Sequence, residues 1–426
     1  MIRAAAPPRR VLMLVENNSY PKDPRVRKEA QALMKAGYLI TVISPAEPRQ
    51  KWHEMIDGVN VYRFPASPQA SSMLSYLYEY AYSMAAISLL AFWVFLRHGF
   101  DVIHAANPPD TLAFVAAFYK CLGKHFVFDH HDLAPEMYYA RFPQGGNKWV
   151  HKALLWCERL SCRIADRVLA VNESYKAIEM RRDGVLEASI TVVRNGPELR
   201  NTWTNESDRD LRAQAGTIIA YAGIIGVQDG VDCLLRALRN LIVTLNRTDV
   251  LCLILGDGEA LPSLRHQADK LAVAQYIRFT GWIDDPGRYA RCLATADICV
   301  DPSPSNPYND RCTAIKMMEY MAAAKPIVAF DLPEHRVTAE SSALYAPPND
   351  ELGFARAIAE LMNDAPRRQI MGAIGRQRIE HSLAWSYSAA RLLDAYSNLL
   401  FTSPRTSARI ANTSSAIRPS QRPAIR

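Results

Sequence analysis

The chain has 426 residues, of which 49% are apolar and 22% charged, so it is long enough for two folded domains and excludes a disordered chain or a lone binding module. Its formal net charge of +7 comes from eight arginines in residues 1–10 and 401–426, because removing these eight from 50 basic residues leaves 42 against 43 acidic ones. The basic excess lies in two tails, so a basic face of the kind that binds nucleic acid is not expected.

Eight cysteines are scattered along the chain without a Cys-x-x-Cys pair, and several lie inside apolar runs, as Cys299 does. This usage is typical of reduced core thiols in a reducing compartment. After Arg9 and Arg10 only five apolar residues follow, at 11–15, whereas the core of a signal peptide needs about 7–15. We therefore expect a cytoplasmic protein.

Short β-branched and apolar runs alternate with longer amphipathic stretches. The predicted strands are residues 11–15, 40–44, 101–104, 126–129 and 167–171 in the first half, and 218–222, 250–255, 277–280, 297–300 and 326–330 in the second. This spacing predicts parallel sheets in βαβ units, with a polar linker at 201–216 between two doubly wound domains. In such α/β folds, ligands bind at the carboxyl ends of the strands, here in the cleft between the domains.

Residues 73–96 form an unusually apolar stretch, with Glu79 as its only charge. Its charge-free part, 80–96, would span about 26 Å as a helix, slightly less than the roughly 30 Å of a hydrocarbon core. A helix pair between strands is favoured over partial insertion into a bilayer, and true spanning is disfavoured because it would split a domain. The residues after Phe401 are rich in Ser, Thr, Pro and Arg and predict a disordered tail that could touch an anionic membrane weakly.

Two adjacent histidines, His130 and His131, follow the strand at 126–129. Neighbours in a strand point to opposite faces, so these two cannot readily share one metal ion. We expect one of them to project into the cleft from the strand end; the alternative is a capping or loop hydrogen-bonding role.

A predicted helix at 313–324 follows the strand at 297–300 and a polar loop. Thr313, Lys316, Glu319 and Tyr320 are spaced to share one of its faces. A solvated Lys–Glu pair is the plain interpretation. However, a helix that begins at the carboxyl end of a strand attracts phosphate, so Lys316 could neutralise a diphosphate and Glu319 could accept from ribose hydroxyls.

Glycines after two predicted strands would let a ligand approach the backbone, although glycine at such turns is also common for steric reasons. These positions are Gly223 and Gly226 in the first turn, and Gly256 with Gly258 in the second.

Taken together, the ordered motifs resemble family 4 glycosyltransferases, the retaining nucleotide-sugar transferases of the GT-B fold, over roughly residues 10–400. The motifs that carry the resemblance are Asp23-x-Arg25-Val26 with Glu29-Ala30, His131-Asp132-Leu133 with Pro135-Glu136, Val193-Arg194-Asn195-Gly196-Pro197, Gln228-Asp229-Gly230-Val231-Asp232, Gly256-Asp257-Gly258, Phe279-Thr280-Gly281-Trp282, and Lys316 through Met321 followed by Pro326 to Arg336.

The resemblance implies an acceptor-binding Rossmann-like domain at 1–200, a nucleotide-sugar-binding one at 201–384, a last helix at about 385–400 that packs back on the first domain, and a basic tail at 401–426. It implies catalytic roles for His131, Lys316 and Glu319. It assigns donor binding to Asn195, Gly223, Gly226, Gly281, Trp282, Ile283, Asp310, Arg311 and Thr313, and acceptor binding to Asn17, Arg25, Asn107, Asp132 and Glu136.

No metal and no other cofactor is expected, because helix-end amides and a basic side chain can stabilise the departing diphosphate. The expected partners are a nucleotide-sugar donor, a saccharide or lipid-linked acceptor and a peripheral membrane contact at the inner face of the membrane, without nucleic acid.

Three features depart from the family pattern. Arg311 stands near the place of an acid that usually precedes Glu319, so Asp310 or Asn309 would replace that acid. Ile224 and Asp229 stand where an arginine and a lysine usually grip the diphosphate, which leaves that charge to Lys316 and Arg311. The first loop reads Glu16-Asn17-Asn18-Ser19 instead of a glycine pair, so acceptor binding stays open.

The leading hypothesis is therefore retaining sugar transfer in polysaccharide or glycolipid assembly. A nucleotide-sugar epimerase of the same fold and a non-catalytic binding protein are the alternatives.

Overall fold

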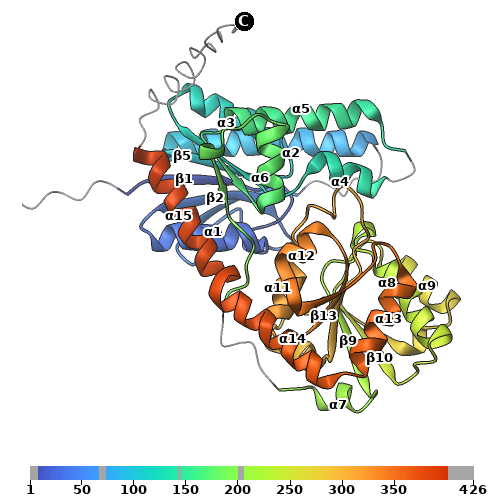
Figure 1. Ribbon diagram of the computed structural model, residues 1–426. Helices are drawn as coiled ribbons and strands as arrows, with labels where there is room; N and C mark the ends of the chain where they lie inside the picture. Colours follow the sequence, from blue (N-terminus) through green and yellow to red (C-terminus); the bar gives the residue numbers. More distant parts are fainter. Residues whose placement is uncertain (1–7, 67–72, 143–144, 200–205, 402–426) are drawn as a thin grey trace, which may run out of the picture.

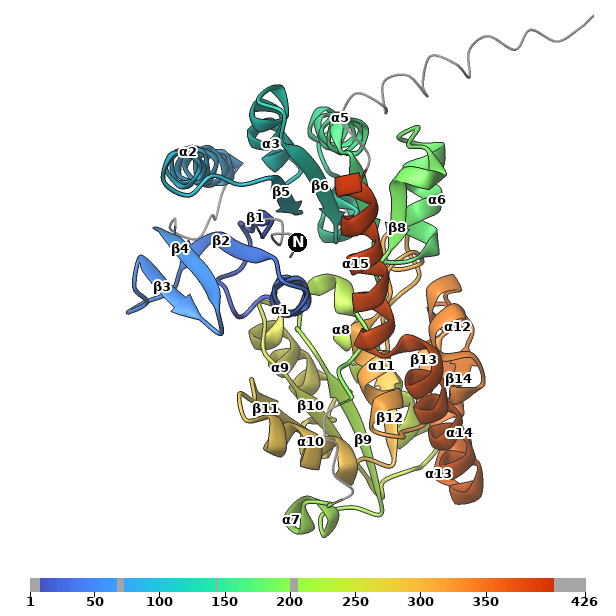
Figure 2. The same ribbon diagram turned by 90° about the vertical axis from the view of Figure 1, so that its left-hand side faces the viewer.

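The computed structural model describes residues 8–66, 73–142, 145–199 and 206–401 and consists of two α/β halves, each built on a mainly parallel sheet. The predicted tail after Phe401 and the first part of the predicted linker lie outside the described residues. Figure 1 shows the two halves one above the other, and Figure 2 shows them turned by 90°.

The first half contains an eight-stranded sheet in the order β3-β4-β2-β1-β5-β6-β7-β8, in which only the β3–β4 pair is antiparallel. Its elements are β1 (Arg10–Leu14), α1 (Pro24–Lys35), β2 (Leu39–Ala46), β3 (His53–Ile56), β4 (Val59–Pro65), α2 (Met73–Arg97), β5 (Val102–Ala106), α3 (Leu112–Cys121), β6 (His125–His130), α4 (Ala134–Arg141), α5 (Lys148–Ile164), β7 (Arg167–Ala170), α6 (Glu173–Arg181), η1 (Glu187–Ser189) and β8 (Ile190–Val192).

The second half contains a six-stranded parallel sheet in the order β11-β10-β9-β12-β13-β14. Its elements are α7 (Arg209–Arg212), β9 (Thr217–Ala222), η2 (Val227–Asp229), α8 (Val231–Arg239), η3 (Asn240–Thr244), β10 (Val250–Leu255), α9 (Leu261–Lys270), η4 (Ala274–Tyr276), β11 (Ile277–Gly281), α10 (Pro286–Thr295), β12 (Ile298–Asp301), α11 (Ile315–Ala322), β13 (Ile327–Phe330), α12 (Pro333–Ala339), η5 (Glu340–Ser342), β14 (Ala343–Ala346), α13 (Glu351–Met362), α14 (Ala365–Arg378) and η6 (Ile379–Leu383).

All ten predicted strands are present, and the structure has four further strands, β3, β4, β8 and β14, that were not predicted. β3 and β4 form a hairpin across Asp57 and Gly58, which adopt φ values of 49° and 85°. Positive φ at both central residues is the geometry of a tight hairpin turn, for which Asp-Gly is a favoured sequence. This dipeptide was the available signal for the pair.

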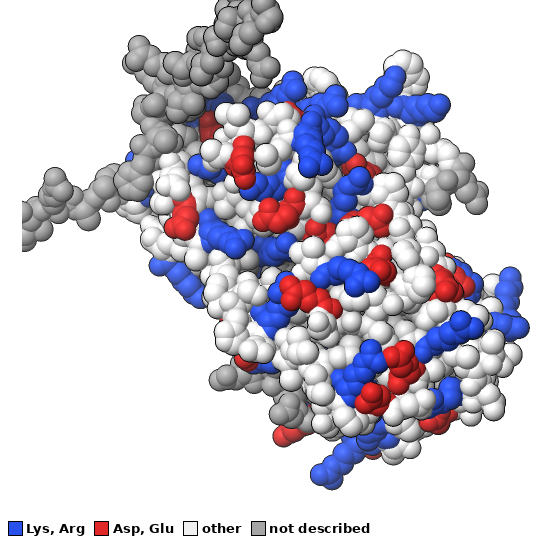
Figure 3. All heavy atoms as spheres, in the orientation of Figure 1, with Lys and Arg blue, Asp and Glu red and all other residues white. Residues whose placement is uncertain are grey.

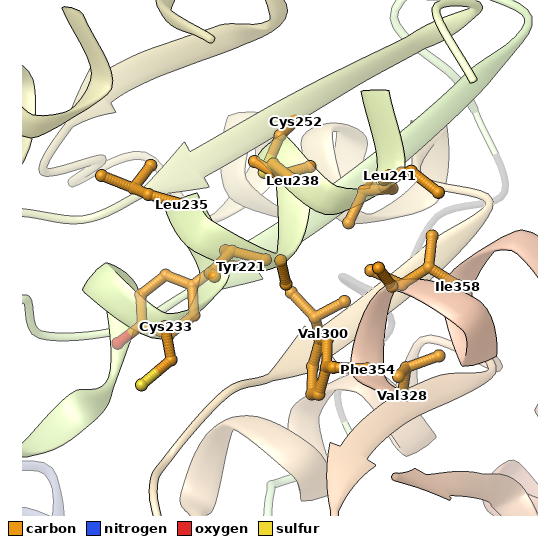
Figure 4. Packing of buried hydrophobic residues seen from close by; sticks show 14 of the residues in the cluster. Tyr221, Cys233, Leu235, Leu238, Leu241, Cys252, Val300, Val328, Phe354 and Ile358 are labelled. Atoms are coloured by element: carbon orange, nitrogen blue, oxygen red, sulfur yellow. The ribbon is translucent and has the colours of Figure 1, made fainter. Parts of the chain in front are cut away.

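Both sheets are covered by helices on two faces, so their central strands are buried except for Arg10 at the start of β1. Figure 4 shows this in the second half, where Tyr221 and Val300 from the sheet meet Leu238 of α8 and Phe354 of α13. Burial on both faces explains why these strands read as continuous apolar runs rather than as alternating ones.

The apolar stretch at 73–96 is one helix, α2, and not the predicted helix pair. It lies between β4 and β5 in the chain and packs on the first core through Ile87, Ala91 and Val94. The part Tyr78–Arg97 has a mean hydropathy of 1.5 and is long and apolar enough to cross a membrane, and 22% of its most apolar 18-residue window is buried. Because its buried side belongs to the core of the first half, we interpret α2 as a surface helix.

After η6 the chain returns to the first half as α15 (Trp385–Phe401). Trp385, Leu392 and Tyr396 join the cluster formed by α1, β1 and β2. Figure 2 shows α15 running from the second half up along the first.

Candidate active site

A cavity of about 1490 Å³ lies between the two halves, at the carboxyl ends of their strands. It is lined by the loops after β1, β5 and β6 on one side and by those after β9, β10 and β12 on the other. Eleven predicted site residues line it, and six do not. Those that line it are Asn17, Arg25, His131, Asp132, Asn195, Gly223, Trp282, Ile283, Thr313, Lys316 and Glu319.

His131 stands at the carboxyl end of β6 with its ring bonded to a buried acid. Its Nε2 hydrogen-bonds the carboxylate of Asp129, and its backbone N–H donates to Asn107 Oδ1 at 2.5 Å. The side chain of Asn107 also spans to Asp132, accepting from its N–H at 3.1 Å and donating to its carbonyl at 2.8 Å. Asn107 thus positions the His131–Asp132 loop. It does not line the cavity, although binding an acceptor would require it to do so.

Arg25 contributes to the cavity wall, but its donors are used inside the protein. The guanidinium binds Asp129 at 2.5–3.1 Å, the Val193 carbonyl at 2.7 Å and Asn195 Oδ1 at 2.9 Å. Burial disfavours ionisation of Asp129, but the charges of Arg25 and His131 outweigh it and lower the pKa of Asp129 well below its usual value. The structure therefore gives Arg25 a positioning role in place of the predicted contact with an acceptor.

Glu29, His104 and Asp129 lie below this wall and could by geometry hold a metal ion. However, the Arg25 guanidinium already lies between two of them, 3.3 Å from Glu29 and 2.5 Å from Asp129. Burial and the Asp129 charge raise the pKa of Glu29 well above its usual value, which disfavours its charged form. His104 Nδ1 in turn meets the Tyr396 hydroxyl of α15 at 2.7 Å. These contacts fit a buried cluster that already contains its own cation, Arg25, better than a metal site.

Lys316 reaches the cavity from the first turn of α11, and it is mostly buried instead of lying on a solvated helix face. Its Nζ lies 3.2 Å from Asp229 and 3.8 Å from Asp301. Burial opposes its charge, yet Asp301, Tyr221 and Asp229 outweigh burial and raise the pKa of Lys316 well above the usual value. Lys316 is therefore a permanent cation, and the acids beneath it offset part of its charge.

The glycines that follow β9 and β10 are required by close approach of the backbone. A Cβ at Gly223 would lie 3.2 Å from Lys316 Cε, and one at Gly256 would lie 1.8 Å from the Gly223 carbonyl oxygen. Both residues adopt positive φ, near 150°, which L side chains rarely adopt. The two turns thus stack on each other beside Lys316.

Glu319 lies one turn further along α11 and accepts a hydrogen bond from Tyr289 at 2.6 Å. Burial raises its pKa, while Tyr289 and the lysines Lys28 and Lys316 partly offset that effect. Trp282 and Ile283 line the cavity beside Glu319 and Tyr289. This arrangement offers an aromatic surface and a carboxylate, the groups that suit a base and a ribose.

Two predictions about α11 are corrected. The helix begins at Ile315, so Thr313 precedes it. Tyr320 does not share the polar face: it is fully buried, and its hydroxyl lies 2.7 Å from the Ala222 N–H and 3.3 Å from the Val300 carbonyl. It thereby ties α11 to the sheet.

The loop before α11 bridges the two halves. Tyr308 donates to Asp132 at 2.8 Å, and Asn172 donates to the Arg311 carbonyl and to Thr313 Oγ1 at 2.7 and 2.9 Å. The Arg311 side chain bonds the carbonyl of Pro307 instead of facing the cavity, so it does not supply the charge expected of it there. Asp310 also lies outside the cavity lining, and Asn309 lines it.

Three other predicted contacts also lie away from the cavity. Gly226 donates its N–H to Asp229 at 3.1 Å, and the Gly281 carbonyl accepts from the N–H of Gly256 at 3.1 Å. Glu136 forms an ion pair with Arg182. None of these three lines the cavity, so their geometry supports the walls and not ligand contact.

Comparison with known proteins matches both halves. Residues 23–196 match the family model described as a glycosyl transferase 4-like domain, and residues 216–364 match glycosyl transferases group 1. The chain belongs to the family 4 glycosyltransferases. This glycosyltransferase is 25% identical over 371 residues to a phosphatidyl-myo-inositol mannosyltransferase of Mycolicibacterium smegmatis, covering 86% of this chain and 87% of the relative.

A second relative is the lipopolysaccharide core biosynthesis glycosyltransferase LpsD of Rhizobium meliloti, 26% identical over 57% of this chain and 63% of the relative. Among solved structures, sucrose-phosphate synthase from Thermosynechococcus elongatus gives a TM-score of 0.74 at 18% identity, covering 92% and 99% of the two chains. Anabaena HepE in complex with UDP-glucose gives 0.69 at 17% identity, covering 91% and 99%. The shared architecture is the predicted GT-B fold.

Several residues of this glycosyltransferase site were not indicated by the sequence patterns. Asp129 holds His131, Tyr289 holds Glu319, and Asp301 lies beneath Lys316. A polar residue at the buried end of an apolar strand was the available signal for Asp129 and Asp301, because such a side chain needs a partner. Tyr289 carried no such signal, since its partner comes from another helix.

Proposed function

We propose that this family 4 glycosyltransferase moves a hexose from a nucleotide sugar to a saccharide or lipid-linked saccharide, with retention at the anomeric carbon, in polysaccharide or glycolipid assembly. One observation carries the proposal: His131 from the first sheet and Lys316 with Glu319 from the second face the same cavity. The relatives named for phosphatidyl-myo-inositol and lipopolysaccharide core transfer support the acceptor class. Their names describe transferases, which disfavours the epimerase alternative.

The donor-binding groups divide the nucleotide sugar among them. Trp282 and Ile283 would line the base, Glu319 would accept from the ribose, and Lys316 would face the diphosphate. Because Asp229 and Asp301 offset part of the lysine charge, the first-turn N–H groups of α11 would supply the rest. These N–H groups have no side-chain cap, and Ala314 and Ile315 line the cavity.

His131 would approach the sugar near the reacting carbon from the opposite wall. Its Nε2 is held by Asp129, so Nδ1 is the ring atom left to face the donor sugar. Nδ1 would hydrogen-bond a sugar hydroxyl, which orients the sugar over the departing diphosphate.

We also propose that transfer needs no metal ion, since a lysine and helix-end amides face the diphosphate. Excess chelator should leave turnover unchanged. A loss of activity that magnesium or manganese restores would overturn this part of the mechanism.

The experiment that tests the function incubates the full chain with a panel of nucleotide sugars and no acceptor. Slow hydrolysis of one donor is expected of a transferase. Epimerised product would support the epimerase, and the absence of turnover and of binding to every donor would support a non-catalytic protein. Thermal-shift screening with UDP-, GDP- and ADP-sugars identifies the donor, because a ligand of the native state raises the melting temperature.

We further propose a cytoplasmic protein at the inner face of the membrane, in peripheral contact through α2 and the tail arginines. Tyr78, Leu89, Phe92 and Leu96 are exposed on α2. Sedimentation with anionic vesicles, for the full chain and for one that ends at Leu400, at two salt concentrations, tests this contact. If neither chain pellets at low salt, the membrane contact is excluded.

A further inference from the structure

The cavity has an apolar wall within the first half, which we call the arm. The arm is lined by Tyr80 of α2, by Met137, Tyr138 and Phe142 at α4, and by Val150 and Leu154 of α5. Among the described lining residues of these three helices, Arg141 is the one with a charge. An arm of this composition suits an apolar chain and offers little to a sugar or a phosphate.

The nucleotide sugar does not need the arm. The contacts proposed for its base, ribose and diphosphate are Trp282, Glu319 and Lys316 of the second half, whereas the arm and the predicted acceptor residue Asp132 belong to the first half. The arm is therefore on the acceptor side of the reacting carbon.

The helices that wall the arm also carry exposed aromatic residues. Near its α5 end, the Trp149 and Phe142 side chains are 76% and 50% exposed. Lys152 Nζ lies 4.9 Å above the Trp149 ring, and Trp156 and Arg159 are exposed further along the same helix. Aromatic rings beside cations suit the headgroup region of an anionic bilayer.

The outer surface agrees with this placement. α2 and α3 contact each other, α3 contacts α5, and Phe114 of α3 stacks near Trp156 with ring centroids 5.9 Å apart. α5 runs along the top of Figure 1, where Figure 3 shows several basic side chains. The three helices form one apolar and basic face, and two of them, α2 and α5, also line the arm.

We propose that the apolar arm binds the hydrocarbon chain of a lipid-linked acceptor, delivered from an anionic membrane on which α2, α3 and α5 rest. This rests on the proposed function and specifies its acceptor as an amphipathic lipid. The polar end of that lipid lies at His131 and Asp132, and its chain leaves the protein between α2 and α5.

The arm is tested with dansylated undecanoic acid, a fluorescent apolar chain whose emission rises and shifts to the blue on burial. Wild-type protein should bind it. Val150→Trp, which fills the arm, should weaken binding at least about tenfold, and Leu154→Trp should do the same in case one variant misfolds. The matched control is Val243→Trp, because Val243 lies in the second half and is 63% exposed.

Equal probe binding by wild type and both arm variants, or no binding by the wild type, would overturn the arm. The assay contains no nucleotide sugar, so this failure is distinguishable from a failure of the proposed function, which donor hydrolysis reports.

The membrane source is tested with vesicles of phosphatidylcholine and phosphatidylglycerol. Trp149→Ala with Trp156→Ala should reduce pelleting while probe binding persists, and Ile370→Ala, an exposed position of the second half, should leave pelleting unchanged. Undiminished pelleting of the double variant would exclude α5 from the membrane face. If the probe binds but neither the wild type nor any variant pellets with the vesicles, the membrane source is excluded and the apolar acceptor arrives from solution.

Discussion

The adjacent residues His130 and His131 lead into two different buried clusters on opposite sides of β6. His131 bonds Asp129 and lines the cavity. His130 is fully buried, with Nδ1 3.0 Å from Glu179 and Nε2 3.8 Å from Glu158. The period of two in a strand separates them, so identical side chains one residue apart serve different purposes.

The difference lies in what each cluster can exchange with its surroundings. The His131 cluster opens onto the cavity, whereas the His130 cluster is closed by Arg182, which pairs with Glu136 and Glu158. Burial disfavours the charge on His130, but the hydrogen bond to Glu179 and the charge of Glu158 outweigh it and raise its pKa to about 9. We therefore expect the His131 side of β6 to contribute to activity and the His130 side to contribute to stability.

The largest test of this comparison is His131→Ala. Transfer should fall by about 10²- to 10⁴-fold, as when a group that acts on the reacting centre is removed, with little change in melting temperature. Single-turnover kinetics and thermal unfolding measure the two effects. Wild-type transfer by this variant would contradict the placement of His131 at the reaction centre.

Glu319→Ala and Lys316→Ala sharpen the comparison on the donor side. Each should weaken donor use about tenfold to a hundredfold, the value of a hydrogen bond to a charged group. Lys316→Ala should lower stability more than Glu319→Ala, because it leaves the buried Asp301 with less compensation, whereas Glu319→Ala removes one hydrogen bond from Tyr289. KM for the donor and melting temperature separate the two; unchanged turnover by either variant rules out the donor-site assignment.

Asp129→Asn tests whether function and stability can be separated at β6, because Asp129 contributes to both. It holds His131 and is also the buried partner of Arg25, so activity and melting temperature should fall together, activity by about tenfold. The pH profile of kcat/KM should shift as well, since the charge that faces the imidazole is lost. A drop in stability with an unchanged profile would show that Asp129 does not act through His131.

The smallest effect is expected at His130, on stability alone. Because its pKa rises from the ordinary 6.5 to about 9 on folding, its stabilisation is complete below pH 6.5 and lost as the pH rises through about 9. Burial raises the pKa of Glu158 to about 8, which acts in the same direction. The melting temperature should fall between pH 6.5 and 9, and His130→Gln should flatten this dependence. A melting temperature that rises with pH in this range would contradict the raised pKa of His130.

The sequence predicted the fold better than the site. β-branched runs such as residues 250–255 mark a buried strand by themselves, whereas β3, with alternate exposed and half-exposed residues, does not. Lys316, Glu319 and His131 were indicated by the motifs around them. Arg25, Asn107 and Arg311 have side chains that suit ligand contact, but they are used within the protein.

These uses depend on residues far apart in the chain. Arg25 finds its partner at Asp129, and Asn172 finds its partners in the loop at Arg311 and Thr313. Spacing along one helix or strand carries no information on such pairs. The apolar arm has the same origin, because its lining residues come from three helices with different local roles.

The return of α15 to the first half reverses the order in which the two halves are finished during synthesis. Everything in the second half, from α7 to η6, precedes Trp385, so it can close its core while the ribosome still holds the last helix. The first half begins earlier but waits for Trp385, Leu392 and Tyr396, which complete its cluster, and for the Tyr396 hydroxyl that meets His104. A chain released before these residues carries a finished second half beside an unfinished first one.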